Sequence, residues 1–135
     1  MITAVDTSII LDILTASPKH LQESKTLLEK GMEEGKLIVC PLVWGELRPF
    51  FKSDEEMKGI LSQMNLEYDD FTPEVASLAG LHWKRYRENK GARNRMLADF
   101  LIAAHAQLKA DRFLTRDRGF YRTYFRQLSF LVLSS

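Results

Sequence analysis

Four acidic residues stand where a parallel β-sheet gathers the side chains that do chemistry. Asp6 ends a short apolar segment, and Glu46 lies about one and a half turns into the helix expected after a second such segment. Asp99 is near the start of a strongly apolar helix, and Asp117 follows a fourth apolar segment. In an open parallel sheet, ligands bind beyond the carboxyl ends of the strands. The pattern therefore predicts that the four carboxylates converge at one edge of a sheet.

Converging carboxylates in desolvated surroundings need a counter-charge. Burial and mutual repulsion raise the pKa of such acids or require a cation among them. Oxygen ligands suit a hard divalent ion, Mg²⁺ or alternatively Mn²⁺. The sequence has one cysteine and three histidines without ligand spacing, which disfavours zinc. A hard ion held by carboxylates activates water for in-line attack on a phosphodiester, so the four acids point to metal-dependent phosphodiester hydrolysis.

Each of the four acids also has a purely structural interpretation. Asp6 and Asp117 stand where a helix N-cap is expected, and the helix dipole favours Asp99 in a first turn. Glu46 fits the exposed face of an amphipathic helix. Their joint placement at one sheet edge favours the functional interpretation. The remaining candidates are interpreted as surface or turn acids: Asp12, Asp69, Asp70 and Asp111.

The net charge of +1 conceals an asymmetry along the chain. Residues 1–83 carry 7 Lys/Arg and 14 Asp/Glu, a net charge of −7, whereas residues 84–135 carry 12 and 4, a net charge of +8. Arginine suits bidentate contact with phosphate. The basic half is compatible with a polyanion such as nucleic acid, although a solvated helix face and loop would give the same count.

Alternating apolar segments and helical patterns predict a three-layer α/β/α sandwich with a mainly parallel sheet. The chain of 135 residues has the length of one domain, residues 1–135. Long connections between consecutive strands favour parallel pairing. Strands are expected at residues 2–5, 37–40, 66–71, 112–115 and 130–133. Helices are expected over residues 7–14, 17–34, 41–49, 54–64, 73–91, 96–108 and 117–125, the third interrupted near Pro49.

Four segments, in the right order and in a chain of the right length, resemble the PIN-domain family, and in particular its small VapC-type toxin members. They are Val5–Ser8, Val43–Leu47, Leu97–Ala106 and Leu114–Tyr121. The resemblance implies an Mg²⁺-dependent endoribonuclease with strand order 3-2-1-4-5. It makes Asp6 and Asp99 the firmest metal ligands, completed by Glu46 and Asp117.

The same resemblance implies supporting residues and partners. Ser8 and Thr115 match hydroxyl positions that support such a site. The arginines expected to grip RNA are Arg93 and Arg95, with Arg116 and Arg118 as weaker candidates. Family members usually form homodimers and are inhibited by a small antitoxin protein laid over the N-terminal helices. Six apolar residues could form such a groove or simply the core: Ile9, Ile10, Ile13, Leu14, Leu27 and Leu28.

The remaining features concern the compartment and the competing functions. A lone cysteine, Cys40, predicts a reducing compartment, and the short apolar runs and the absence of a signal-peptide pattern predict a cytoplasmic protein without a membrane segment. The main alternative is a non-catalytic RNA-binding or regulatory module of the same fold. A receiver domain needs adjacent acids after the first strand, and a dehalogenase-type phosphatase needs an aspartate where Ser8 stands, so both are disfavoured.

Overall fold

The computed structural model describes residues 1–89 and 95–133. Short apolar, β-branched segments form four strands, and each is followed by one or two helices. The strands are β1 (Ile2–Val5), β2 (Lys36–Val39), β3 (Leu66–Tyr68) and β4 (Arg112–Leu114). The helices are α1 (Thr7–Leu14), α2 (Leu21–Glu34), α3 (Pro41–Leu47), the 3₁₀ turn η1 (Arg48–Phe50), α4 (Asp54–Gln63), α5 (Pro73–Glu88), α6 (Leu97–Lys109) and α7 (Arg118–Tyr124). None of these helices is both long enough and apolar enough to cross a membrane.

The sheet is parallel throughout the described residues, and its strand order is β3-β2-β1-β4. Ala4 pairs with Ile38 on one side of β1 and with Phe113 on the other, so β1 is a central strand. The α/β sandwich and the expected order are thus confirmed. The expected fifth strand at residues 130–133 is reduced to one parallel bridge between Phe113 and Phe130, on the predicted side of β4.

Helix boundaries follow local capping chemistry in most places. Ser53 caps α4 through the amide of Glu56, and Thr72 caps α5 through the amide of Val75. The helix expected from residue 17 is an exception, because α2 begins only at Leu21. There the Ser17 hydroxyl accepts from the amide of His20 in a separate turn, which delays the regular helix.

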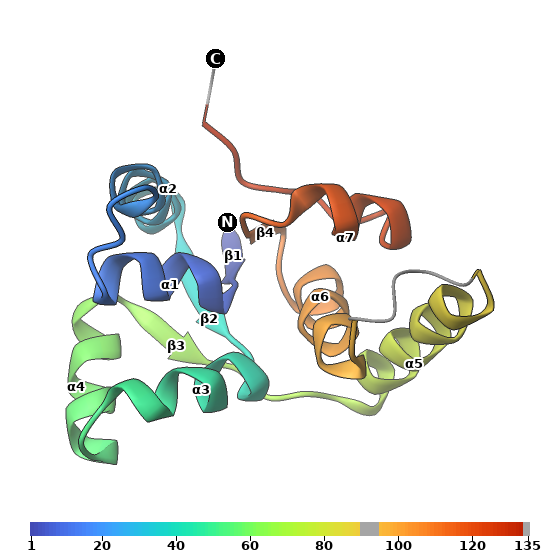
Figure 1. Ribbon diagram of the computed structural model, residues 1–135, viewed down its shortest axis with the longest axis horizontal. Coiled ribbons are helices and arrows are strands. Elements are labelled where there is room, and N and C mark those ends of the chain that lie inside the picture. Colours follow the sequence, from blue (N-terminus) through green and yellow to red (C-terminus); the bar gives the residue numbers. More distant parts are fainter. Residues whose placement is uncertain (90–94, 134–135) are drawn as a thin grey trace.

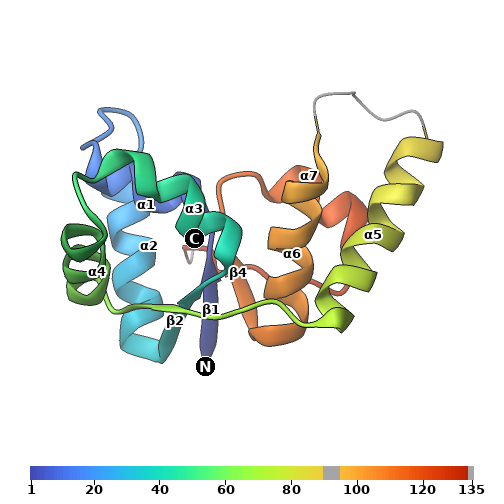
Figure 2. The same cartoon turned by 90° about the horizontal axis from the view of Figure 1, so that it is seen from below.

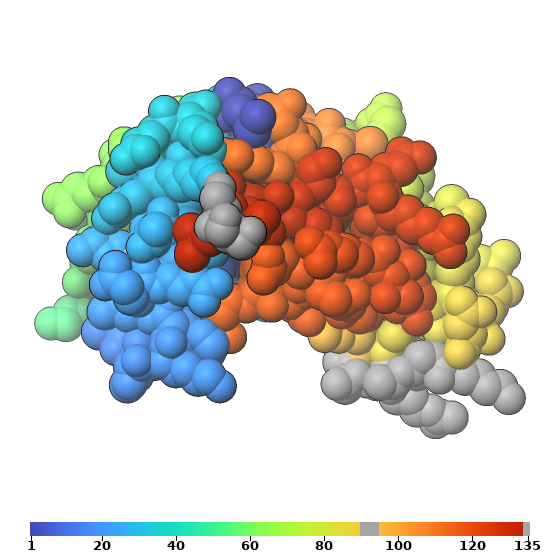
Figure 3. Space-filling view, turned by 90° about the horizontal axis from the view of Figure 1, so that it is seen from above, coloured from blue at the N-terminus to red at the C-terminus, as the bar shows by residue number. Residues whose placement is uncertain are grey.

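The two halves of the chain lie on opposite sides of the central strands (Figure 1). Helices α1 to α4 gather on one side, and α5 to α7 gather on the other, as the turned view also shows (Figure 2). The last described residues return to the N-terminal half (Figure 3). Leu131 and Leu133 line a hollow there together with Leu27 of α2. The acidic half and the basic half of the sequence therefore meet along β1 and β4.

The core fixes these elements without help from disulfides. Its largest fully buried side chains include Phe100, Phe113, Phe125 and Leu47, and Cys40 is buried as a free thiol. Burial of an aromatic side chain of this kind stabilises the fold by about 2–3 kcal/mol. Val5, Val39 and Leu114, which end β1, β2 and β4, are buried in this core, so the core fixes where the following segments begin.

Candidate active site

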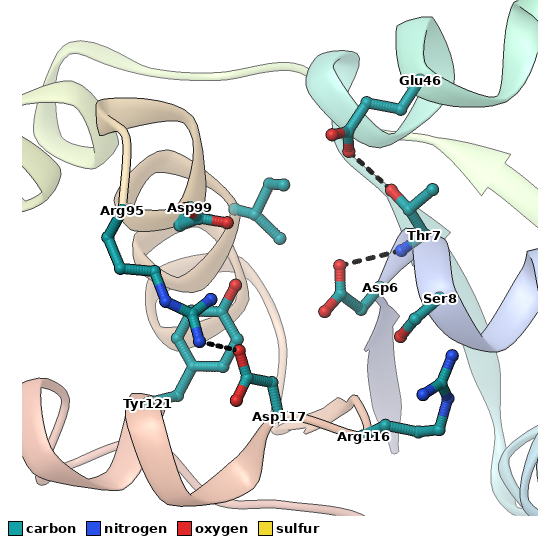
Figure 4. A pocket seen from close by; sticks show the side chains of 10 residues that line it. Asp6, Thr7, Ser8, Glu46, Arg95, Asp99, Arg116, Asp117 and Tyr121 are labelled. Atoms are coloured by element: carbon teal, nitrogen blue, oxygen red, sulfur yellow. Dashed lines mark hydrogen bonds and ion pairs between the residues drawn. The ribbon is translucent and has the colours of Figure 1, made fainter. Parts of the chain in front are cut away.

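The four predicted acids line one pocket at the carboxyl edge of the sheet. The pocket has a volume of about 410 Å³, and its walls include Asp6, Glu46, Asp99 and Asp117 (Figure 4). Asp6 follows β1, Glu46 lies on α3, Asp99 lies in the first turn of α6, and Asp117 stands between β4 and α7. Segments separated by up to 111 positions in the sequence thus contribute to one acidic hollow.

Asp6 is held by two hydrogen bonds in a strongly desolvated position. Its Oδ1 accepts from the Thr7 amide at 2.8 Å, and its Oδ2 accepts from the Thr115 hydroxyl at 2.7 Å. Burial nevertheless raises the pKa of Asp6 from 3.8 to about 6, and the charges of Glu46 and Asp99 add to this rise. Asp6 therefore stands in surroundings that disfavour its charged form. The N-cap role and the pocket role coexist in this residue, since Asp6 also caps α1.

Glu46 and Asp99 are held by lighter contacts. The Thr7 hydroxyl donates to Glu46 Oε1 at 2.6 Å, so the two residues close one wall of the pocket (Figure 4). Glu46 is otherwise exposed. Asp99 accepts a 3.2 Å hydrogen bond from the Met96 amide at the start of α6. Neither of these two carboxylates forms an ion pair within the described part of the chain.

Asp117 is the acid that already has a cation beside it. The Arg95 guanidinium forms an ion pair with Asp117, and it stacks 3.9 Å from the centre of the Phe120 ring. The Asp117 amide donates to the Thr115 hydroxyl, which itself donates to Asp6. Thr115 therefore couples two acids of the pocket, and Arg95 supplies a positive charge inside it.

Besides Thr7, two further residues belong to the site although the sequence pattern did not single them out. Tyr121 is 2% exposed and lines the pocket, and burial together with the charges of Asp6 and Asp99 raises the pKa of its phenol. Its position four residues after Asp117, on the same side of α7, is the signal that could have indicated it. The second residue, Asp12, acts from outside the pocket.

The interpretation of Asp12 as a surface acid is wrong. Asp12 is 4% exposed, and it accepts two hydrogen bonds from Arg116, at 2.8 and 3.1 Å, and one from the Ser24 hydroxyl at 2.7 Å. A carboxylate is buried there because the Arg116 fork neutralises it. This ion pair fixes Arg116 at the pocket wall, next to Asp117.

The other predicted site residues divide into three groups. Ser8 and Arg116 line the pocket, and Thr115 bonds to Asp6 behind it. Arg118 lines a separate hollow near α2, so it does not reach the acids. Arg93 lies outside the described residues.

The donor set fits a hard divalent cation by its chemistry. The available ligands are carboxylate and hydroxyl oxygens, which Mg²⁺ and Mn²⁺ prefer. As the side chains are placed, no three acidic, histidine or cysteine residues of the described chain converge closely enough to share one ion. Thr7 occupies one oxygen of Glu46, and Arg95 occupies one oxygen of Asp117, so each of these carboxylates keeps its other oxygen for a cation.

Several solved structures share this fold at low sequence identity. VapBC2 from Rickettsia felis bound to a promoter DNA fragment matches with a TM-score of 0.72 and 20% identity, covering 96% of this chain and 97% of that one. VapBC-1 from nontypeable Haemophilus influenzae matches with a TM-score of 0.72 and 15% identity, covering 98% of both chains. VapC20 from Mycobacterium tuberculosis, a toxin that cleaves the sarcin–ricin loop, matches with a TM-score of 0.63 and 16% identity, covering 94% and 98%.

Sequence comparison identifies the family directly. No curated protein sequence matches the chain. The family model described as the PIN domain matches residues 3–126, which include all four acids of the pocket. The chain therefore belongs to the PIN-domain family, as its sequence motifs predicted.

Proposed function

We propose that the protein is a divalent-metal-dependent endoribonuclease that acts as the toxin of a toxin–antitoxin pair. The observation that carries this proposal is the pocket shared by Asp6, Glu46, Asp99 and Asp117 in a chain of the PIN-domain family. A protein of the same fold, VapC20, is a toxin that cleaves the sarcin–ricin loop, which is RNA. The proposed reaction is hydrolysis of an RNA phosphodiester bond.

In this proposal Asp6 and Asp99 are the principal ligands of Mg²⁺ or Mn²⁺. When bound, the ion would supply the positive charge that a phosphodiester transition state requires. The hydroxyl of Thr115 and the amide of Thr7 hold the Asp6 carboxylate in one orientation. Fixed ligands of this kind reduce the reorganisation that binding would otherwise cost.

Glu46 and Asp117 complete the proposed site. Glu46 is exposed at the pocket wall, where its carboxylate can accept a hydrogen bond from the attacking water and orient it. Asp117 pairs with Arg95 through Oδ2 alone, so its other oxygen would be left for the ion or for a water molecule. Tyr121 is buried and contributes part of the pocket lining.

The RNA backbone requires cations beside the acids, and two arginines of the pocket are suited to this role. Arg116 is exposed at the wall while Asp12 fixes its orientation. Arg95 stacks on Phe120 and can exchange Asp117 for a substrate phosphate. Such contacts position a polyanion without selecting its sequence. Arg93 is retained as an RNA contact on the sequence resemblance alone.

The proposed partners are a cognate antitoxin and a second copy of this chain, in a cytoplasmic setting. VapBC2 from Rickettsia felis and VapBC-1 from Haemophilus influenzae have a similar fold. This likeness supports an antitoxin as a partner of the present chain. The apolar groove considered for it is mostly core, since Ile9, Ile10, Leu27 and Leu28 are buried. The antitoxin surface therefore has to lie elsewhere or use the half-buried remainder of α1.

A non-catalytic RNA-binding module is the second candidate function. It is favoured by one observation, namely that no three acids of the described chain converge on a common point while Arg95 neutralises Asp117. Arginine in a carboxylate pocket can serve as the permanent counter-charge in place of a metal ion. The two candidates differ in whether RNA is cut and in whether a metal ion is required.

Cleavage of total RNA by the purified protein distinguishes the two candidates. The nuclease proposal predicts fragments in Mg²⁺ or Mn²⁺ and none in excess chelator. Asp6→Asn and Asp99→Asn should each lower the cleavage rate by at least about 100-fold while the far-ultraviolet circular dichroism spectrum is retained. A matched control is Asp54→Asn, because Asp54 is an exposed acid on α4. Undiminished cleavage in both pocket variants would exclude the nuclease proposal, and RNA binding without any cleavage would support the module.

A further inference from the structure

A second hollow lies on the other side of α7, between that helix and α5. It has a volume of about 570 Å³, larger than the acidic pocket. We call it the α5–α7 cavity, and its lining residues are Leu78, Leu81, His82, Arg85, Asn89, Gln107, Thr123, Tyr124, Arg126 and Gln127. This lining contains two arginines and no acid. In Figure 3 the atoms of α7 (red) lie beside those of α5 (yellow) at this side of the molecule.

The two arginines of the cavity have no counter-charge within the described residues. Four other arginines form ion pairs with acids: Arg48, Arg95, Arg112 and Arg116. Arg87 and Arg122 stack on aromatic rings instead. Arg85, Arg118 and Arg126 do neither; of these three, Arg85 and Arg126 are exposed and line the cavity. A concave surface that keeps two guanidinium groups free of acids is suited to an external anion.

The remaining polar lining is made of neutral groups that donate or accept hydrogen bonds. Burial and the charge of Arg85 lower the pKa of His82, which disfavours its charged form. Asn89, Gln107 and Gln127 contribute amides, and Tyr124 contributes an aromatic ring and a hydroxyl. Amides bond to the edges of nucleobases, and aromatic or guanidinium planes stack on their faces. The chemistry of the cavity therefore matches a phosphate together with an attached base.

The α5–α7 cavity and the acidic pocket share one short helix. Asp117 precedes α7, and Tyr121 of that helix lines the acidic pocket, whereas Thr123 and Tyr124 line the cavity. An α-helix of seven residues is about 10 Å long, so a strand of a few nucleotides can reach from one hollow to the other.

We propose that the α5–α7 cavity is a second RNA-binding site, which holds a backbone phosphate and its nucleotide some nucleotides away from the cleaved bond. The inference rests on the proposed function, since it assigns part of the same substrate to a different surface. An acidic peptide would also satisfy the arginines, and its backbone could bond to the amides. The shared helix α7 favours RNA over it, because RNA is the ligand that would also enter the acidic pocket.

Binding measured without cleavage tests this site directly. Fluorescence anisotropy with a labelled single-stranded RNA of about 12 nucleotides, in an Asp6→Asn background with chelator, reports affinity alone. Arg85→Ala and Arg126→Ala should each weaken binding about 3- to 10-fold, and the double variant more. Each should also lower the slope of log affinity against log salt by about 0.7, as for one lost phosphate contact on a single strand. Arg126→Lys should retain most of that slope.

The controls are arginines of the same region that lie outside the cavity. Arg87→Ala on α5 and Arg122→Ala on α7 remove one charge each, yet they should change the affinity less than 2-fold. Cleavage of an RNA of two nucleotides, which is too short to occupy both hollows, should not respond to Arg85→Ala in the otherwise wild-type chain.

The outcomes separate this inference from the proposed nuclease function. If the wild-type chain cuts RNA but all four arginine variants bind it alike, the cavity is not an RNA site. If the chain never cuts RNA, yet the cavity variants alone lose binding, the nuclease proposal fails and the second site stands. Loss of binding to an acidic peptide, with RNA affinity unchanged, would reassign the cavity to a protein partner and overturn the inference.

Discussion

Replacing Asp6 with asparagine should make the metal-free protein more stable while removing its proposed activity. The carboxylate of Asp6 is charged at neutral pH in surroundings that disfavour the charge, since burial raises its pKa to about 6. Asparagine has nearly the same shape and carries no charge. The substitution therefore relieves a cost that a bound cation would otherwise relieve.

The expected gain is worked out from the pKa and the lost hydrogen bonding. A rise from 3.8 to about 6 corresponds to about 3 kcal/mol at pH 7, at about 1.4 kcal/mol for each pH unit. Asparagine weakens one of the two bonds that Asp6 accepts, from Thr7 and Thr115, which costs about 1 kcal/mol. The net stabilisation is about 2 kcal/mol, or a rise in Tm of about 6–8 °C for a domain of this size.

The pH dependence has a definite sign. The pKa of Asp6 in the folded chain lies above its value of 3.8 in the unfolded chain, so charging Asp6 costs stability as the pH rises from about 4 through 6. Below about pH 4 the side chain is protonated in both states, and the cost is absent. The stability difference between Asp6→Asn and the wild-type chain should therefore shrink toward pH 4.

Thermal unfolding measures this difference directly. The two chains are compared in excess chelator at pH 7.5, 5.5 and 4, and then at pH 7.5 with Mg²⁺ or Mn²⁺. The metal ion should stabilise the wild-type chain and leave Asp6→Asn unchanged, because the principal ligand is gone. An exposed acid serves as the control, since Asp54→Asn should shift the Tm by less than about 2 °C. A variant that is less stable than the wild-type chain at pH 7.5, or a gain that persists at pH 4, would refute the reasoning.

Three further predictions concern residues around the pocket and in the core. Arg95→Ala removes the positive charge beside the Asp117 carboxylate. Isothermal titration should therefore show a 2- to 10-fold higher affinity for Mn²⁺ in the absence of RNA. Unchanged affinity would mean that the arginine does not compete with the ion. Asp12→Ala removes a buried acid from its arginine partner and should lower the free energy of unfolding by about 2 kcal/mol in urea titration, whereas Asp54→Ala should lower it by less than about 0.5 kcal/mol. His105 is buried against Asp69, and burial lowers its pKa below 6.5, so the folded chain should lose stability as the pH falls below that value. His105→Gln should remove this component of the pH dependence, and an identical pH slope in both chains would contradict it.

The sequence predicted the placement of the acids because that placement follows from topology. An acid at the end of a short apolar strand lies at the carboxyl edge of a parallel sheet, whichever rotamer it adopts. This rule alone was enough to predict the positions of Asp6 and Asp117. The position of Asp99 could be predicted from the strong apolar pattern of α6, because a carboxylate interrupts the buried face of that helix.

The contacts made by those acids could not be predicted in the same way. Arg95 precedes α6, and Asp117 follows β4. Their ion pair depends on the paths of the two loops that contain them. The burial of Asp12 depends on Arg116, which is 104 positions away along the chain. Local periodicity carries no information about such pairs, so Asp12 was assigned to the surface.

The sequence misplaced segment boundaries where local hydrogen bonding competes with the apolar periodicity. Ser17 and Pro18 are residues typical of a helix start. In the structure the Ser17 hydroxyl accepts a hydrogen bond from the His20 amide within a turn that precedes α2. The segment at residues 130–133 has the apolar composition of a strand. Only Phe130 is bridged to β4, and its partner there is Phe113. Both hydrogen bonds of this bridge involve Phe113, whose amide donates to the Ser129 carbonyl and whose carbonyl accepts from the Leu131 amide.

Binding of Mn²⁺ to the wild-type chain and to Asp99→Asn tests most directly whether the acidic pocket captures a divalent ion. Electron paramagnetic resonance distinguishes free from bound Mn²⁺, and no RNA or enzymatic activity is needed. Saturable binding to the wild-type chain, weakened at least about 10-fold in Asp99→Asn and unchanged in Asp54→Asn, is the predicted result. Equal binding to all three chains, or no saturable binding to the wild-type chain, would contradict a metal site built from these four carboxylates.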